Sequence, residues 1–373
     1  MKNAIFTLVF GNENYITGVI LSAYIHKKFI KSINLDIDLV IMVDDKIYEY
    51  KNELLKYFDI VKKIDLLELK LSEKFIYYFK KYSKFMKYLI NKWQILQFEE
   101  YNKILFLDSD FLPIKKDFYK IFNLNTPALF PNISNTYICN NNIIPTNYLM
   151  KKHDIEKIKK YKAEQYYNVS LKLNFSIDAT IGLFTPKKKL YNEYLDFINK
   201  ASINGYISSE CSAVDETSLL LFFAFYKNIQ VYCIDKEYCL SPWYHKDYNL
   251  NKVSGINYIS LIKPWLKFPF LQWPEEIIWH KIANHAMKKS KIIKNIYING
   301  LLQNLKLLIT YDIQTNIKKN KYFIELQKIL ENNTNITYEN KIIVKQIIKL
   351  NKKICYNLNN KSIIDYTNIN NLL

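Results

Sequence analysis

The first third of the chain shows two patterns of apolar residues. Short, nearly unbroken apolar runs are typical of buried strands, and they cover residues 4–10, 37–43 and 103–107. A further short strand is expected over residues 60–66. Between these runs, apolar residues recur at helical spacing, which predicts helices over residues 14–30, 46–57 and 82–101. Strands separated by helices indicate βαβ units, so we expect an α/β protein with a largely parallel, Rossmann-like sheet.

The pattern changes twice in the rest of the chain. Residues 123–174 are polar and rich in Asn and Tyr, and an insert of this size is typical of a lid or an acceptor-binding element. A basic helix is expected within it. After residue 286, Lys-rich segments with periodic Ile and Leu predict helices over 289–309, 318–332 and 339–356. We therefore predict a main domain over residues 1–285 and a helical C-terminal region over 286–373.

The composition is typical of a globular protein and limits the kinds of partner that it can bind. The chain is 49% hydrophobic and 16% aromatic, and it has no apolar run long enough to span a bilayer. Its formal charge is +18, but all 53 basic residues are Lys. Because only Arg reads guanine or phosphate with two parallel hydrogen bonds, no specific nucleic-acid partner is expected.

The first residues of the chain and its cysteines both indicate the same cellular compartment. The apolar start of the chain lacks a small-residue cleavage site, so it is interpreted as a first strand rather than a signal peptide. The five cysteines form no C-x-x-C pair, and their odd number argues against a full disulfide framework. A cytoplasmic location is therefore expected.

Two carboxylates follow the apolar run at 104–107. Side chains at i and i+2 on a strand point the same way, so Asp108 and Asp110 are expected to converge where the strand ends. Such a pair suits Mg²⁺ or Mn²⁺, with positions left for phosphate and water. The six glycines form neither G-x-G-x-x-G nor a Walker A loop, so a bound diphosphate would be neutralised by metal and lysine instead.

These features and several later motifs resemble the glycogenin-like retaining glycosyltransferases, family 8, which have the GT-A fold. The resemblance covers roughly residues 4–270. The motifs that carry it are, in chain order, Thr7-Leu8 with Asn12 and Tyr15, Lys92, Asp108-Ser109-Asp110, Asp178-Ala179-Thr180, Asp215-Glu216, and Lys263-Pro264-Trp265.

The resemblance implies a GT-A-like fold, a Rossmann-like mixed sheet flanked by helices, and a function. That function is metal-dependent, retaining transfer of a hexose from a UDP-sugar to an acceptor hydroxyl on a protein or glycan, with Mn²⁺ or Mg²⁺ as cofactor. The resemblance assigns nucleotide-sugar binding to seven residues: Thr7, Tyr15, Lys92, Asp108, Ser109, Asp110 and Lys263. It assigns the catalytic set to Asp178, Asp215, Glu216 and Lys263.

The sequence departs from the family pattern at two points. The family's third metal ligand is a His six residues before the Lys of Lys-Pro-Trp, and here that position is Asn257, whose amide oxygen can also bind Mg²⁺ or Mn²⁺. A shifted alignment would bring in His245 instead. Asp178 and Glu216 stand where the family has amides, which leaves the donor sugar open.

Several alternatives stay open. Asp215 and Glu216 also suit the first turn of a predicted helix, where the macrodipole favours carboxylates. Glu216 is either a covalent nucleophile or the stabiliser of a front-side substitution. His280 and His285 are interpreted as structural, because the Glu of H-E-x-x-H is missing.

Two other functions compete with glycosyl transfer. A haloacid-dehalogenase-type phosphatase also uses an apolar strand followed by D-x-D, but Asp108 follows a fourth strand and precedes the bulky Phe111-Leu112-Pro113. The other alternative is an inactive transferase-like fold that binds polyanions or a membrane surface through the Lys-rich C-terminal region. A homodimer is also left open.

Overall fold

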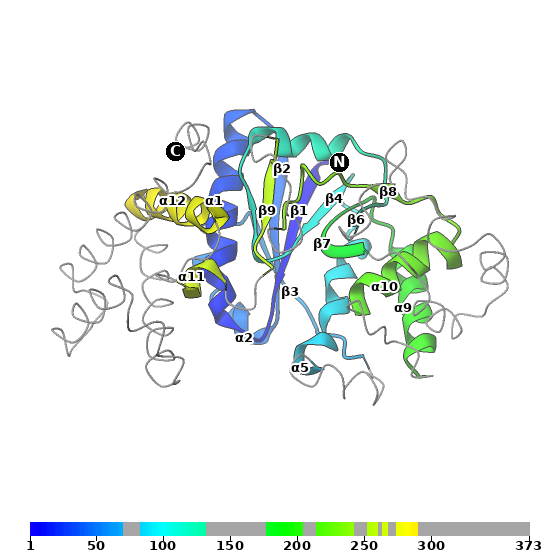
Figure 1. The fold of residues 1–373 in the computed structure, drawn as a ribbon. Coiled ribbons are helices and arrows are strands. Elements are labelled where there is room, and N and C mark those ends of the chain that lie inside the picture. Colours follow the sequence, from blue (N-terminus) through cyan, green and yellow to red (C-terminus); the bar gives the residue numbers. More distant parts are fainter. Residues whose placement is uncertain are drawn as a thin grey trace, which may run out of the picture.

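A seven-stranded mixed sheet organises the fold (Figure 1). The computed structural model of the protein describes residues 1–69, 83–131, 177–203, 214–241, 252–259, 263–267 and 274–289. The strands of this sheet, in spatial order, are β3 (Ile60–Lys63), β2 (Ile37–Val43), β1 (Asn3–Val9), β4 (Ile104–Leu107), β7 (Ile177–Phe184), β6 (Ala128–Pro131) and β8 (Tyr232–Cys233). A smaller sheet pairs β5 (Phe111–Pro113) with β9 (Gly255–Asn257).

Strand directions make the sheet mixed rather than purely parallel. β1 runs parallel to β2 and β4, and β2 runs parallel to β3. β7 is antiparallel to both of its neighbours, β4 and β6, while β6 is parallel to β8. The expected α/β class, with a mixed sheet flanked by helices, is therefore confirmed.

Helices cover both faces of the sheet and enclose two apolar cores. Figure 1 shows α1 (Ile16–Ser32), α11 (Pro264–Lys267) and α12 (Pro274–Lys289) on one side, and α9 (Lys188–Ile203) and α10 (Val214–Leu220) on the other. The remaining helical elements are η1 (Glu13–Tyr15), α2 (Asp45–Tyr48), α3 (Lys51–Leu54), α5 (Ser83–Met86), η2 (Leu89–Gln97), η3 (Lys116–Asn123) and the π-helix η6 (Leu221–Tyr226).

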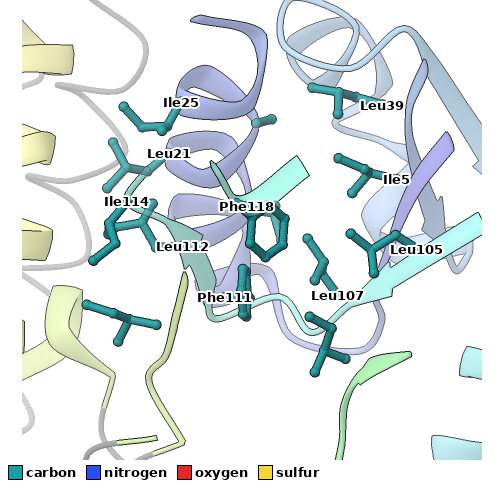
Figure 2. Packing of buried hydrophobic residues seen from close by; sticks show 14 of the residues in the cluster. Ile5, Leu21, Ile25, Leu39, Leu105, Leu107, Phe111, Leu112, Ile114 and Phe118 are labelled. Atoms are coloured by element: carbon teal, nitrogen blue, oxygen red, sulfur yellow. The ribbon is translucent and has the colours of Figure 1, made fainter. Parts of the chain in front are cut away.

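The two cores bury both faces of the central strands. Leu21 and Ile25 of α1 lie on one side of the helix, together with Ile114. Ile5 and Leu105 of the central strands lie on its other side, and Phe118 lies between the two groups (Figure 2). The alternate side chains of the same strands, such as those of Phe6 and Phe106, join a second core with η2, α9 and α10. Because both faces are covered, the central strands are apolar at nearly every position.

The N-terminal elements largely agree with the hydrophobic pattern. The strands predicted over 4–10, 37–43 and 103–107 are β1, β2 and β4, and the helix predicted over 14–30 is α1 with the short turn η1 before it. The helix predicted over 46–57 is divided into α2 and α3, and the strand predicted over 60–66 ends at Lys63.

The prediction of a single amphipathic helix over residues 82–101 is wrong. The chain instead forms the short α5 and then the 3₁₀ helix η2. The buried side chain of Asn91 accepts from the backbone N–H of Leu67 at 2.8 Å and donates to the backbone oxygens of Leu67 at 2.9 Å and Tyr88 at 2.7 Å. Side-chain bonds of this kind compete with the i→i−4 ladder. Residues 90–96 are all buried, so the element has no polar face.

Several expected elements lie outside the described residues. They include most of the insert at 123–174, with its basic helix over 152–164, and the C-terminal helices beyond Lys289. Within the part of the chain that the structure describes, no helix combines the length and apolarity needed to cross a bilayer.

Two of the five cysteines lie in the described residues. Cys239 is a buried free thiol, whereas Cys233 is disulfide-bonded. Because disulfides are uncommon in the cytosol, the cytoplasmic location stays a prediction.

The first prediction concerns the side chain that breaks the expected helix. Replacing Asn91 by Ala removes three hydrogen bonds to the backbone of Leu67 and Tyr88, so we expect the free energy of unfolding to fall by about 2–4 kcal/mol. Urea denaturation measures this. Asn102→Ala is the matched control, because the Asn102 side chain bonds only at the exposed surface, and its effect should be small. Equal effects in the two variants would contradict this role of Asn91.

The second prediction concerns His26 on α1. Its Nδ1 lies 2.8 Å from the Tyr119 hydroxyl, and burial lowers its pKa to about 3. The unfolded chain binds a proton near pH 6.5 and the folded chain does not, so stability is complete above that pH and falls on acidification. Between about pH 6 and pH 4, His26 should remove about 1.4 kcal/mol of stability per pH unit. In His26→Asn this part of the slope disappears in urea titrations across pH. An unchanged slope would show that His26 is charged in the folded state.

Candidate functional site

The acidic motif lies in a tight turn where β4 ends. Phe111 N–H donates to the Asp108 carbonyl oxygen at 3.1 Å, so the chain reverses within Asp108, Ser109 and Asp110 before entering β5. Asp108 N–H also donates to Thr180 O of β7 at 2.8 Å. The two carboxylates are thus positioned by a turn, and not by the side-chain alternation of a strand.

A buried lysine from η2 joins two of the candidate carboxylates. Lys92 Nζ lies 2.9 Å from Asp108 Oδ1 and 3.0 Å from Asp215 Oδ2, and it donates to Ala179 O at 3.4 Å. The side chain of Lys92 is 10% exposed and that of Asp215 is 1% exposed. Burial favours the neutral amine, but the two carboxylates outweigh it and raise the pKa of Lys92. The site therefore holds a permanently charged ammonium group.

A second lysine joins the other acid of the motif. Lys263 is ion-paired with Asp110 and donates to Tyr258 O at 3.1 Å. Its ammonium lies 5.7 Å from the centroid of the Tyr15 ring, within range of a cation–π contact. Burial opposes the charge of Lys263, and Asp110 more than offsets it, so its pKa is raised.

The Lys-Pro-Trp segment is packed against the first loop and helix. Trp265 Nε1 donates to Asn14 O at 2.8 Å, and its ring meets that of Tyr15 edge to face at 6.3 Å. A Cβ at Gly18 would clash with the Trp265 indole and approach Ser109 O to 2.9 Å. Only glycine allows α1 this close to both the tryptophan and the acidic turn.

A hydrogen-bonded chain links β7 to β9 on the same edge. Asp178 Oδ1 accepts from Thr180 N–H at 2.9 Å and from the Thr180 hydroxyl. Asn257 Nδ2 donates to the same hydroxyl oxygen at 2.7 Å. Asn257 pairs with Phe111 across the small sheet, so its side chain lies beside the acidic turn. Asn257 Oδ1 is buried and accepts no hydrogen bond from the residues that the structure describes.

The site carries more acids than bases. Four carboxylates (Asp108, Asp110, Asp178 and Asp215) face two ammonium groups (Lys92 and Lys263), a formal excess of two negative charges. Burial raises the pKa of Asp108 to about 7; Lys92 opposes this rise and Asp110 adds to it. Burial also raises the pKa of Asp178, against the hydrogen bonds from Thr180.

This donor set fits a hard divalent cation. Among the described residues no cluster of three or more His, Cys, Asp or Glu could hold a metal, so the carboxylates of Asp108 and Asp110 need another oxygen. Asn257 Oδ1 is a candidate for this oxygen, because it is buried and accepts no hydrogen bond within the described part of the chain. Oxygen-only ligation and a local excess of two negative charges suit Mg²⁺ or Mn²⁺. His245, the alternative ligand, lies outside the described residues.

The other candidate residues lie around this centre. Thr7 of β1 lines a cavity of about 20 Å³ with Asp108 and His26, and its hydroxyl has no partner among the described residues. Ser109 is half-buried in the turn, and Glu216 is half-buried in the first turn of α10, beside Asp215.

Both histidines expected to be structural belong to α12. His280 is buried and its Nε2 lies 3.2 Å from Pro264 O. Burial lowers its pKa to about 3, so it stays neutral. The side chain of His285 lies outside the described residues.

Two contacts of the site are not indicated by the sequence motifs. Thr180 had been noted only as part of a motif, although its position two residues after Asp178 places both side chains on one face of β7. Trp93 Nε1 donates to Asp215 O at 3.1 Å and fixes the start of α10. No sequence signal connects Trp93 with Asp215, because they are far apart in the chain.

Comparisons with known proteins give weak likenesses. No family model and no curated protein matches the sequence. Among solved structures, the chain is similar to the galactosyltransferase LgtC bound to donor and acceptor sugar analogs, with 12% identity, a TM-score of 0.38, and coverage of 70% of this chain and 89% of that one.

Two further solved structures have comparable values. The glycosyltransferase GlyE of Streptococcus pneumoniae TIGR4 has 14% identity and a TM-score of 0.41, with 75% of this chain and 60% of that one covered. Mouse xyloside xylosyltransferase 1 has 12% identity and a TM-score of 0.37, with 69% and 98% covered. Likenesses at this level do not establish a shared activity.

The third prediction tests the buried ion pairs. Lys92→Met keeps most of the side-chain volume but leaves Asp108 and Asp215 without their cation, so we expect the free energy of unfolding to fall by about 3–5 kcal/mol. Chemical denaturation at pH 7 measures the change. Lys227→Met is the control, because the Lys227–Glu193 pair is partly exposed and should contribute at most about 1 kcal/mol. A loss no larger than that of the control would mean that the ammonium does not hold the two acids together.

Proposed function

We propose that this chain is a metal-dependent retaining glycosyltransferase that transfers a hexose from a UDP-sugar to an acceptor hydroxyl. The observation that carries the proposal is the turn after β4, where Asp108 and Asp110 meet with a different buried lysine on each. Two further aspartates, Asp178 and Asp215, surround the turn and leave the formal excess of two negative charges. A divalent cation bound by the acids would compensate that charge, and Lys92 and Lys263 would then be available to phosphate.

The first step is binding of the diphosphate. Asp108, Asp110 and Asn257 would hold Mn²⁺ or Mg²⁺, and the bound ion would neutralise the diphosphate as it leaves. Lys263 can donate to a phosphate oxygen because its ammonium lies at the acidic turn, near the Tyr15 ring. Thr7, Tyr15 and Ser109 surround this corner and are proposed to contact the uridine.

The second step is orientation of the sugar. Asp178 and Asp215 are held by Thr180 and Lys92, so each carboxylate is fixed before substrate arrives. Fixed acceptors can orient sugar hydroxyl groups and so lower the entropic part of the barrier. Lys92 couples Asp215 to the diphosphate side, because it contacts both Asp215 and Asp108.

The third step is exchange at the anomeric carbon. The bond from that carbon to the β-phosphate oxygen breaks, the bond to the acceptor oxygen forms, and the acceptor proton passes to the departing phosphate. Glu216 is half-buried next to Asp215. It either forms a transient covalent bond to the sugar or stabilises the positive charge during front-side attack.

One observation favours the alternative of an inactive, polyanion- or membrane-surface-binding module. Asp108 and Asp110 are each already paired with a lysine, which can substitute for a metal in a site that has lost activity. The Lys-rich region over 286–373 would then supply the binding surface.

The fourth prediction separates the two functions. Purified protein is incubated with a panel of nucleotide sugars, with and without Mn²⁺, and free UDP is measured. We expect UDP release from one UDP-sugar that depends on Mn²⁺ and falls at least about 100-fold in the double variant Asp108→Asn with Asp110→Asn.

Asp117→Asn is the matched control, because Asp117 is an exposed acid on η3 that is paired with Lys120. It should keep full activity. Folded wild-type protein that releases no UDP from any donor, or asparagine variants as active as the wild type, would refute the transferase and favour the binding module.

A further inference from the structure

Three polar side chains of the candidate site contact one another. Asp178, Thr180 and Asn257 form one hydrogen-bonded chain. The hydroxyl of Thr180 is its central member. It lies between the Asp178 carboxylate and the Asn257 amide, on the edge of the sheet that also carries the acidic turn.

The chemistry of a hydroxyl group fixes the direction of each bond. Thr180 has one hydroxyl proton, and the Asp178 carboxylate can only accept it. The Thr180 oxygen must therefore accept its second bond, and Asn257 Nδ2 donates it at 2.7 Å. The amide nitrogen of Asn257 consequently faces Thr180, and the amide oxygen faces away.

The amide oxygen is then left without a donor. Asn257 is 1% exposed, and its Oδ1 accepts no hydrogen bond from the described residues. The backbone places Asn257 beside the acidic turn, because Asn257 pairs with Phe111 and the next residue, Tyr258, donates its N–H to Asp110 O at 3.1 Å. A buried carbonyl oxygen without a donor is costly unless a cation or a polar group reaches it.

We infer that Thr180 is a positioning residue, which holds the Asn257 amide so that its oxygen serves as the third ligand of the divalent cation. This inference rests on the proposed metal dependence. The pair of Thr180 and Asn257 would then supply what one imidazole supplies in the family. A glycine at position 180 could not do this, because it has no hydroxyl to accept the amide N–H.

Direct measurement of Mn²⁺ binding tests the inference without relying on turnover. The full chain is titrated with Mn²⁺ in the presence of UDP, and free Mn²⁺ is followed by electron paramagnetic resonance. Thr180→Val removes the hydroxyl and keeps the branched shape that suits a strand. We expect it to weaken Mn²⁺ binding by about 10-fold, the lower end for loss of a partner that orients a metal ligand.

Four further variants make the result specific. Thr180→Ser retains a hydroxyl and should bind Mn²⁺ like the wild type. Asn257→Ala removes the ligand itself, so adding Thr180→Val to it should cause no further loss. Thr180→Ala replaces Thr180→Val if the valine variant does not fold, and circular dichroism checks each protein.

Each outcome has a defined meaning. Mn²⁺ binding by Thr180→Val as tight as in the wild type overturns the inference, and so does a loss that adds to that of Asn257→Ala. In both cases the proposed function stands, because the wild type still binds Mn²⁺. If the wild type binds no Mn²⁺ in the presence of UDP, the metal dependence fails together with the inference.

Discussion

The interaction on which the site most depends is the buried ammonium of Lys92. It connects three segments that are distant in the chain: η2, the turn after β4, and the start of α10. Two carboxylates in so apolar a place repel one another and lose their hydration, and burial already raises the pKa of Asp108 to about 7. With Lys92 between them, the two acids remain together at one edge of the sheet.

The need to hold Lys92 in this buried position also explains why η2 is not a regular α-helix. A regular amphipathic helix would expose one face, but residues 90–96 are all buried, and Asn91 and Gln94 bond to the backbone of the loop at 65–67. That anchoring fixes the segment that carries Lys92. Stability and site geometry are therefore provided by the same short element, which is a reason for the chain to give up regular helical hydrogen bonds there.

Much of this arrangement could be predicted from the sequence, and the exceptions share one cause. Apolar runs determine β1, β2 and β4, because those strands are buried on both faces and their pattern is local. The motif residues Lys92, Asp108 and Asp110 were also predictable as candidates. Their pairing was not, because which lysine meets which acid depends on contacts between distant segments. The break of the helix expected over 82–101 has the same origin in the bonds of Asn91 to Leu67.

The antiparallel direction of β7 has a consequence for how such a protein can diversify. Pro131 at the end of β6 pairs with Ile177 at the start of β7, and β6 runs parallel to β4 through the shared neighbour β7. The chain therefore leaves the sheet after residue 131 and returns at residue 177 at neighbouring positions, on the edge where the acidic turn lies. Because the two ends are already fixed, doubling the number of residues between them would cost only about 0.6 kcal/mol of loop-closure entropy. Evolution or design can thus replace the sequence between these two strands, while the strands and the buried charges of the acidic turn stay the same.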